Sequence, residues 1–225
     1  MKYFGEGLSG KHKELYRLLR KRDSFNEAVQ LFLELHASLH LSGVSGTPPD
    51  EVDALLKDLT PAEAAAMPEK NGETISWALW HMARIEDLTM NVLVAESQQV
   101  FTDSIRKKIN SPITDTGNAL TQEEIRTFSA QVNLPALIAY RNKVGLQTRK
   151  IVSALTSDDM KRPVTKSSLD AVLAAGGVTQ QPDSVWLLDY WGSRDVAGLL
   201  LMPPTRHLML HLNDCCRWKI MLRKR

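Results

Sequence analysis

Apolar side chains recur along most of the chain at three- and four-residue spacing, the pattern of helices that bury one face. This pattern predicts four long helices at about residues 24–41, 73–95, 134–157 and 205–223. Because long connections separate them, we predict an all-α fold: a four-helix bundle with long crossover connections and extra short helices. One apolar stripe, in the third long helix, consists of Leu137, Tyr140, Val144, Thr148, Ile151 and Leu155.

Residues that start or stop helices mark the connections. Thr121 and Glu124 have the spacing of a capping box, in which each side chain bonds the backbone N–H of the other residue. Pro203 and Pro204 are expected to stop a helix because proline lacks a backbone donor, and Thr205 is expected to start the last helix. The short helices are expected at about residues 11–21, 50–57, 61–66, 121–131 and 193–201.

Two stretches depart from the helical pattern. Residues 111–119 have the composition of a loop. The stretch around Gly176, Gly177 and Pro182 shows no clear period, and its run 184–190 is compatible with an extended strand. We therefore treat residues 158–192 as an insertion within one domain that spans residues 1–225.

Composition favours a soluble protein of the cytoplasm. The 225 residues are 43% hydrophobic and 24% charged, so the chain can bury a core without disulfides or a structural metal. Cys215 and Cys216 are adjacent and cannot easily pair with each other, which fits a reducing compartment. Residues 1–10 do not resemble a signal peptide, and the apolar run 197–202 is too short to cross a bilayer.

Two basic clusters raise the alternative of phosphate binding. Both lie on predicted helices, where a solvated face and a helix C-terminus are the favoured explanations. With a net charge of only +2, we expect no nucleic-acid partner. The clusters consist of Lys11, Lys13, Arg17, Arg20, Lys21 and Arg22, and of Arg217, Lys219, Arg223, Lys224 and Arg225.

The histidines carry the clearest chemical signal. His207 and His211 are four residues apart on the last helix, so both imidazoles project from one face, one turn apart. A single helix supplies two ligands to one metal ion at this spacing, although an isolated pair is more often structural. His81 lies in the apolar stripe of the second long helix, and it would complete a set of three if it faced the pair. Three neutral imidazoles with an open position are typical of catalytic metal sites.

The segments around these histidines resemble the DinB/YfiT-like family of metal-dependent enzymes. The resemblance rests on residues 75–90, with their Trp-His-Met-Ala-Arg core, and on residues 206–213, Arg-His-Leu-Met-Leu-His-Leu-Asn. It implies a four-helix bundle in down-up-up-down order with one long crossover. It also implies a metal site on one histidine of the second helix and a His-x-x-x-His pair of the fourth, here His81, His207 and His211. The long insertion departs from the family pattern.

The same resemblance suggests an activity. The family includes transferases that use low-molecular-weight thiols and a mycothiol-dependent maleylpyruvate isomerase. A divalent ion on three uncharged ligands keeps its full charge, so it can remove a proton from a bound thiol or water. Zinc or nickel suits imidazole ligands. A small-molecule substrate, and either a thiol-dependent S-transferase or a hydrolase, are therefore expected.

Other side chains have competing interpretations. His36 and His40 form a second pair four residues apart; they could line a pocket, orient a ligand or join the metal, but the pattern favours one packed and one exposed histidine. Cys215 could be a soft fourth ligand or a small core residue. Arg206 could meet an anionic substrate or cap the proline turn, and Trp80 could form pocket wall or core.

No catalytic residue follows from the sequence. Glu86 and Asp87 could serve as acid–base groups, but charges on a helix are usually solvated. Two alternatives to an enzyme therefore stay open: a non-catalytic metal- or ligand-binding stress-response protein, and a helical interaction module without metal. A homodimer is plausible because helical bundles with wide apolar faces often pair.

Overall fold

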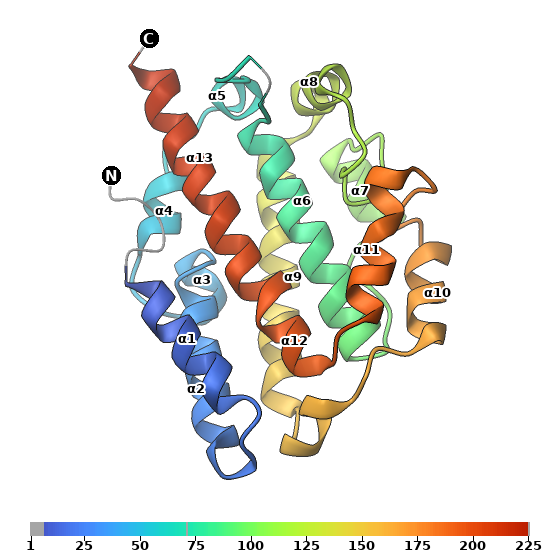
Figure 1. Cartoon of the computed structure of the whole chain (residues 1–225). Helices are drawn as coiled ribbons and strands as arrows, with labels where there is room; N and C mark the ends of the chain where they lie inside the picture. Colours follow the sequence, from blue (N-terminus) through green and yellow to red (C-terminus); the bar gives the residue numbers. More distant parts are fainter. Residues whose placement is uncertain (1–6, 71, 225) are drawn as a thin grey trace.

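The four long helices predicted from the sequence form the body of the structure (Figure 1), a computed structural model that describes residues 7–70 and 72–224. They are α2 (Phe25–Ala37), α6 (Ile75–Asp87), α9 (Leu134–Ala154) and α13 (Leu208–Arg223). Helix α6 packs against both α9 and α13, and α2 packs against α9. Helices α6 and α9 run in one direction and α2 and α13 in the other (Figure 1), so a long crossover joins α6 to α9. The predicted all-α bundle is confirmed.

Short helices occupy the connections. The capping box of Thr121 and Glu124 is present, with both reciprocal bonds made. Within the described residues, no helix is long and apolar enough to span a membrane. Residues 1–6, on which the absence of a signal peptide partly rests, and Arg225 of the second basic cluster lie outside the described part of the chain. The short helices are α1 (Leu8–Leu18), α3 (Ser42–Ser45), α4 (Glu51–Leu56), α5 (Pro61–Ala65), α7 (Asp103–Ile109), α8 (Gln122–Gln131), α10 (Lys166–Ala174), α11 (Pro182–Gly192) and α12 (Val196–Leu200).

Two long helices contain wider, π-helical turns. Helix α6 continues into η2 (Leu88–Val94), and η4 (Met202–His207) leads directly into α13. Helix α12 ends at Leu200, ahead of Pro203 and Pro204, as predicted, but the start of the last helix at Thr205 is wrong. The proline pair lies in the first turn of η4, where missing N–H groups cost little because a first turn has no partners for them. Thr205 is not a cap, since its hydroxyl donates to the Leu200 carbonyl.

The insertion is mostly helical. It contains a short 3₁₀ helix, η3 (Ser157–Lys161), followed by α10 and α11. The interpretation of residues 184–190 as an extended strand is therefore wrong, because these residues lie inside α11. Ser184, Leu187 and Trp191 are the buried residues of α11, and their spacing is that of one helical face. Pro182 stands in the first turn, a position where proline favours a helix.

One face of α6 holds residues 114–117 of the crossover, here called the crossover loop, through four side-chain nitrogens. The residues stand at positions i, i+3, i+4 and i+7, which share a face of the helix. All four bonds are 2.9 or 3.0 Å long, and they fix residues 114–117 against α6. The nitrogens belong to Trp77, Trp80, His81 and Arg84, and they bond the carbonyl oxygens of Gly117, Asp115, Thr116 and Thr114 respectively.

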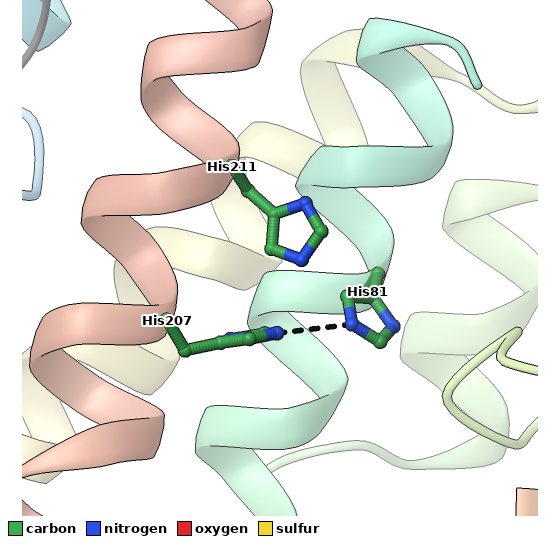
Figure 2. Close-up of side chains that lie close together, drawn as sticks. All are labelled: His81, His207 and His211. Carbon is green, nitrogen blue, oxygen red and sulfur yellow. Dashed lines mark hydrogen bonds between the residues drawn. The ribbon is translucent and has the colours of Figure 1, made fainter. Parts of the chain in front are cut away.

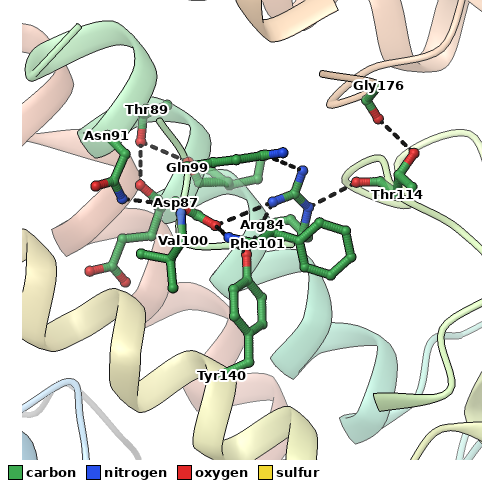
Figure 3. Close-up of polar contacts among 12 residues, drawn as sticks. Arg84, Asp87, Thr89, Asn91, Gln99, Val100, Phe101, Thr114, Tyr140 and Gly176 are labelled. Carbon is green, nitrogen blue, oxygen red and sulfur yellow. Dashed lines mark hydrogen bonds and ion pairs between the residues drawn. The ribbon is translucent and has the colours of Figure 1, made fainter. Parts of the chain in front are cut away.

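A buried ion pair anchors the end of this row (Figure 3). Arg84 and Asp87 are both fully buried, and the Tyr140 hydroxyl of α9 lies between them, accepting from Arg84 at 3.1 Å and donating to Asp87 at 2.7 Å. Arg84 also donates to Gln99 at 3.0 Å. Asp87 therefore has a structural role rather than the solvated position expected of it. Its carboxylate also accepts from Asn91 and from the backbone N–H groups of Val100 and Phe101.

We predict that Arg84→Met destabilises the protein by about 3–5 kcal/mol, because it leaves the Asp87 carboxylate buried without its cation. Urea unfolding followed by circular dichroism measures this loss. Lys166→Met is the matched control, because its ion pair with Asp170 is exposed and should contribute less than about 1 kcal/mol. Equal effects of the two substitutions would show that the buried network does not support the fold.

Candidate metal centre

Three histidines converge between α6 and the start of α13 (Figure 2). His81 lies on α6, His207 is the last residue of η4, and His211 follows one turn later on α13. Their candidate ligand atoms all lie within 4.8 Å of one another. The ring centroids are 4.6 to 4.9 Å apart and the rings meet edge to face. The structure thus brings together the three residues that the sequence singled out.

The protonation of His81 is fixed by the crossover loop. Its Nδ1 atom lies 2.9 Å from the Thr116 carbonyl oxygen, and a carbonyl can only accept, so Nδ1 carries the proton. The lone pair of Nε2 then points toward the other two rings. The Trp77 ring stacks on the imidazole at a centroid distance of 4.7 Å and an angle of 8°, which fixes its plane. A backbone carbonyl behind the ring is a common device for orienting a metal-binding histidine.

The Nε2 atoms of His81 and His207 are hydrogen-bonded to each other, and their spacing is compatible with a divalent ion between them. His207 Nε2 lies 3.0 Å from His81 Nε2, and the buried Nδ1 atoms of His207 and His211 have no partner among the described residues. Zinc–nitrogen bonds of about 2.0–2.1 Å place two tetrahedral ligands roughly 3.3 Å apart, only a few tenths of an ångström beyond this separation. The three side chains therefore form a group that can hold an ion.

Burial keeps all three imidazoles neutral. Desolvation lowers the pKa of His81 to about 3 and that of His211 to about 4. The pKa of His207 lies well below its usual value, first because of burial and then because of the neighbouring His81 and His211. Neutral imidazole is the form that binds metal, so the group is ready for an ion at neutral pH.

These pKa directions predict acid sensitivity of the metal-free protein. Histidine in the unfolded chain titrates near 6.5, so below about pH 6.5 the unfolded state binds protons that the folded state does not. The contribution of these histidines to the free energy of unfolding is therefore fully present above that pH. It falls as the pH drops toward about 4, by up to about 1.4 kcal/mol per pH unit for each histidine.

Urea unfolding of metal-stripped protein between pH 7.5 and 4.5 measures this dependence. A triple variant with His81, His207 and His211 replaced by glutamine serves as the control and should lose less stability on acidification. An identical acid profile for the two proteins would contradict the assignment of these histidines as neutral in the folded state.

A cavity of about 270 Å³ opens beside the histidines. His81 and His207 border it, and its walls come from α6, the residue that follows the crossover loop, α11 and η4. The sequence analysis did not identify the contribution of α11, because that helix lay in a stretch without a clear period. The other lining residues are Ile85, Asn118, Trp186, Leu187, Tyr190, Trp191, Met202 and Pro203.

None of the five side chains suggested as pocket lining borders this cavity. Trp80 is fully buried in the core, where it contacts Phe101, Phe128 and Tyr140. Cys215 is a free, fully buried cysteine outside the histidine group, and burial raises the pKa of its thiol. Arg206 is exposed, and the last two, His36 and His40, lie elsewhere in the bundle.

His36 and His40 form a second buried group with Glu86. Both histidines are fully buried, so the expectation that one is exposed is wrong. The Glu86 carboxylate lies between them, 2.9 Å from His36 Nε2 and 3.1 Å from His40 Nε2. Glu86 is therefore not a solvated helix charge. The burial of Glu86 depends on tertiary packing, because its two histidine partners are 50 and 46 positions away in the sequence.

The second group has the geometry of a hydrogen-bonded unit. His40 Nδ1 lies 3.2 Å from the His36 carbonyl oxygen, and burial lowers the pKa of His40 to about 3, so this imidazole is neutral near pH 7. Although burial opposes it, His40 and His36 hold the pKa of Glu86 well below its usual value, so the ionised carboxylate accepts from the imidazoles. The two imidazole rings stack with their centroids 4.0 Å apart and their planes at 20°, so both Nε2 atoms face the Glu86 carboxylate side by side. Although the ligand atoms lie within 4.8 Å, they are already engaged in these hydrogen bonds, which favours a hydrogen-bonded unit over a metal site.

Gly145 of α9 provides a test of this packing. A Cβ atom there would meet His40 Cδ2 at 2.5 Å and Nε2 at 2.8 Å. We predict that Gly145→Ala destabilises the protein by about 1–3 kcal/mol through overpacking, although alanine gains about 1 kcal/mol in helix propensity. Gly10→Ala in α1, where the added atom meets nothing within 4 Å, should be neutral or stabilising. Thermal unfolding compares the two, and a stabilising Gly145→Ala would refute the close packing.

Fold and site together define a class of protein: a helical bundle with a three-histidine cluster between two of its long helices. The sequence profile of the DinB superfamily matches residues 47–214, which is more than half of the chain and includes all three histidines. The chain therefore belongs to the DinB superfamily, as the resemblance predicted. His36 and His40 precede the matched region. No curated protein matches the chain.

Proposed function

We propose that this chain binds one divalent transition-metal ion, zinc or nickel, through His81, His207 and His211 and transfers a low-molecular-weight thiol to a small electrophile. The observation that carries the proposal is the convergence of three neutral imidazoles, two of which border a cavity. Three protein ligands leave a coordination position for a substrate. When bound, the ion would act as a Lewis acid that lowers the pKa of a thiol.

The thiol must come from outside the chain. Cys215 and Cys216 are buried, and burial raises the pKa of Cys215 and raises that of Cys216 to about 11. Neither sulfur is therefore available as a thiolate, the nucleophilic form. In the transfer, the substrate sulfur forms a bond to an electrophilic carbon, the leaving group departs with the bonding electron pair, and the thiol proton passes to the leaving group or to solvent.

The cavity favours thiol transfer over hydrolysis. No aspartate or glutamate is among its described lining residues, and Glu86 and Asp87 are both engaged in buried networks. Attack by water is usually assisted by a general base, whereas a thiol with a pKa near 8.5 ionises readily once its pKa is lowered. The chain's own contribution is to hold His81 in the correct tautomer and to surround the substrate with mostly apolar walls.

Metal analysis tests the ligand set. We expect about one equivalent of zinc or nickel in the reconstituted protein and almost none in His207→Ala, because losing one of three ligands weakens binding strongly. His12→Ala is the matched control, since His12 belongs to neither histidine group and should leave the metal content unchanged. If reconstitution loads no metal, the helical interaction module becomes the better interpretation.

The activity test follows on the metal-loaded protein. Formation of thioether from glutathione or cysteine and an activated aryl halide should be lost in His207→Ala and retained in His12→Ala. A protein that binds metal but neither transfers thiols nor hydrolyses simple esters and amides would instead be a non-catalytic binder.

A further inference from the structure

Helix α11 presents an aromatic wall to the cavity. Trp186, Tyr190 and Trp191 all line it, and the Trp186 and Tyr190 rings meet nearly edge to face with centroids 5.9 Å apart. Trp186 is 47% exposed, which is unusual for so large an apolar side chain. The Arg194 guanidinium lies 4.5 Å from the Tyr190 ring centroid and orients that ring. An aromatic compound in the cavity would stack on these rings.

The opposite walls are aliphatic and uncharged. Ile85 of α6 and Met202 and Pro203 of η4 line the cavity, and none of its described lining residues is lysine, arginine, aspartate or glutamate. An ionised group that enters such walls loses its hydration without gaining a partner, which costs several kcal/mol. The body of the occupant is therefore uncharged.

The size of the cavity sets the size of its occupant. Its volume is about 270 Å³, whereas an apolar cavity of about 150 Å³ accommodates benzene. The space therefore fits roughly two fused rings. A charged, extended thiol such as a peptide thiol does not match it, so the thiol would approach from the open side.

Asn118 supplies one polar contact. Its Oδ1 atom accepts a hydrogen bond from the Thr116 hydroxyl at 3.1 Å, which leaves the amide NH₂ to donate. Asn118 lines the cavity and follows directly the loop that orients His81. A carbonyl or similar acceptor on the occupant would bond to this amide.

We propose that the cavity binds an uncharged aromatic compound of about two rings that carries a hydrogen-bond acceptor, stacked on the α11 aromatic wall and bonded to Asn118. The inference rests on the proposed function in one respect only: this compound would be the electrophile that receives the thiol. Binding itself depends on the cavity walls and does not require the metal.

Calorimetric titration of the metal-stripped protein with naphthamide and with naphthoate tests the proposal. The two probes have the same shape, but only naphthoate is charged, and without metal its carboxylate has no ion to bind. We expect naphthamide to bind at least about tenfold more tightly. Equal affinities, or no binding of naphthamide, would overturn the proposal.

Variants locate the bound probe. Trp186→Ala should weaken naphthamide binding roughly tenfold, whereas Tyr16→Ala removes another exposed aromatic ring, away from the cavity, and should change nothing. Asn118→Leu should weaken naphthamide but not naphthalene, which has no acceptor. Unchanged naphthamide affinity in both Trp186→Ala and Asn118→Leu would place the probe elsewhere and refute the site.

A further variant separates this inference from the proposed function. His211 belongs to the metal-binding group but does not line the cavity, so His211→Ala should lose the metal and bind naphthamide within about twofold of the original protein. If the original protein takes up no metal on reconstitution but binds naphthamide, the proposed function is refuted and the aromatic site is supported. Metal uptake without naphthamide binding would do the reverse.

Discussion

The row of hydrogen bonds between α6 and the crossover loop is the constraint on which the site depends. Residues 114–117 have no regular structure to fix their backbone, and four side chains of one helix face fix it instead. Because the Thr116 carbonyl is held in this way, the proton of His81 stays on Nδ1 and its Nε2 lone pair faces the cluster. The same loop brings Asn118 to the cavity.

Loss of hydration determines how the ionisable side chains near this row behave. Arg84 and Asp87 compensate each other's loss of hydration in the core by pairing with each other and with Tyr140, and this network ties α6 to α9. The three candidate ligands have no such counter-charges, so burial keeps them neutral. One helix thus carries a compensated ion pair and, one turn earlier, an imidazole whose Nε2 faces another neutral imidazole.

The sequence predicted those features that depend on local periodicity. The His207–His211 pair follows from a spacing of four on one helix, and the four long helices follow from their apolar stripes. Helix α11 was not predicted, because its consecutive apolar residues 185–188 hide the helical period. The grouping of Glu86 with His36 and His40 depends on tertiary packing between α2 and α6, which no local pattern encodes.

The most direct test of the central claim is X-ray absorption spectroscopy of the zinc-loaded protein, because it reports the donor atoms themselves. The structure predicts about three imidazole nitrogens at roughly 2.0–2.1 Å and one further light atom. A sulfur neighbour at about 2.3 Å, or a shell of oxygens without imidazole scattering, would contradict the assignment of His81, His207 and His211 as the ligands.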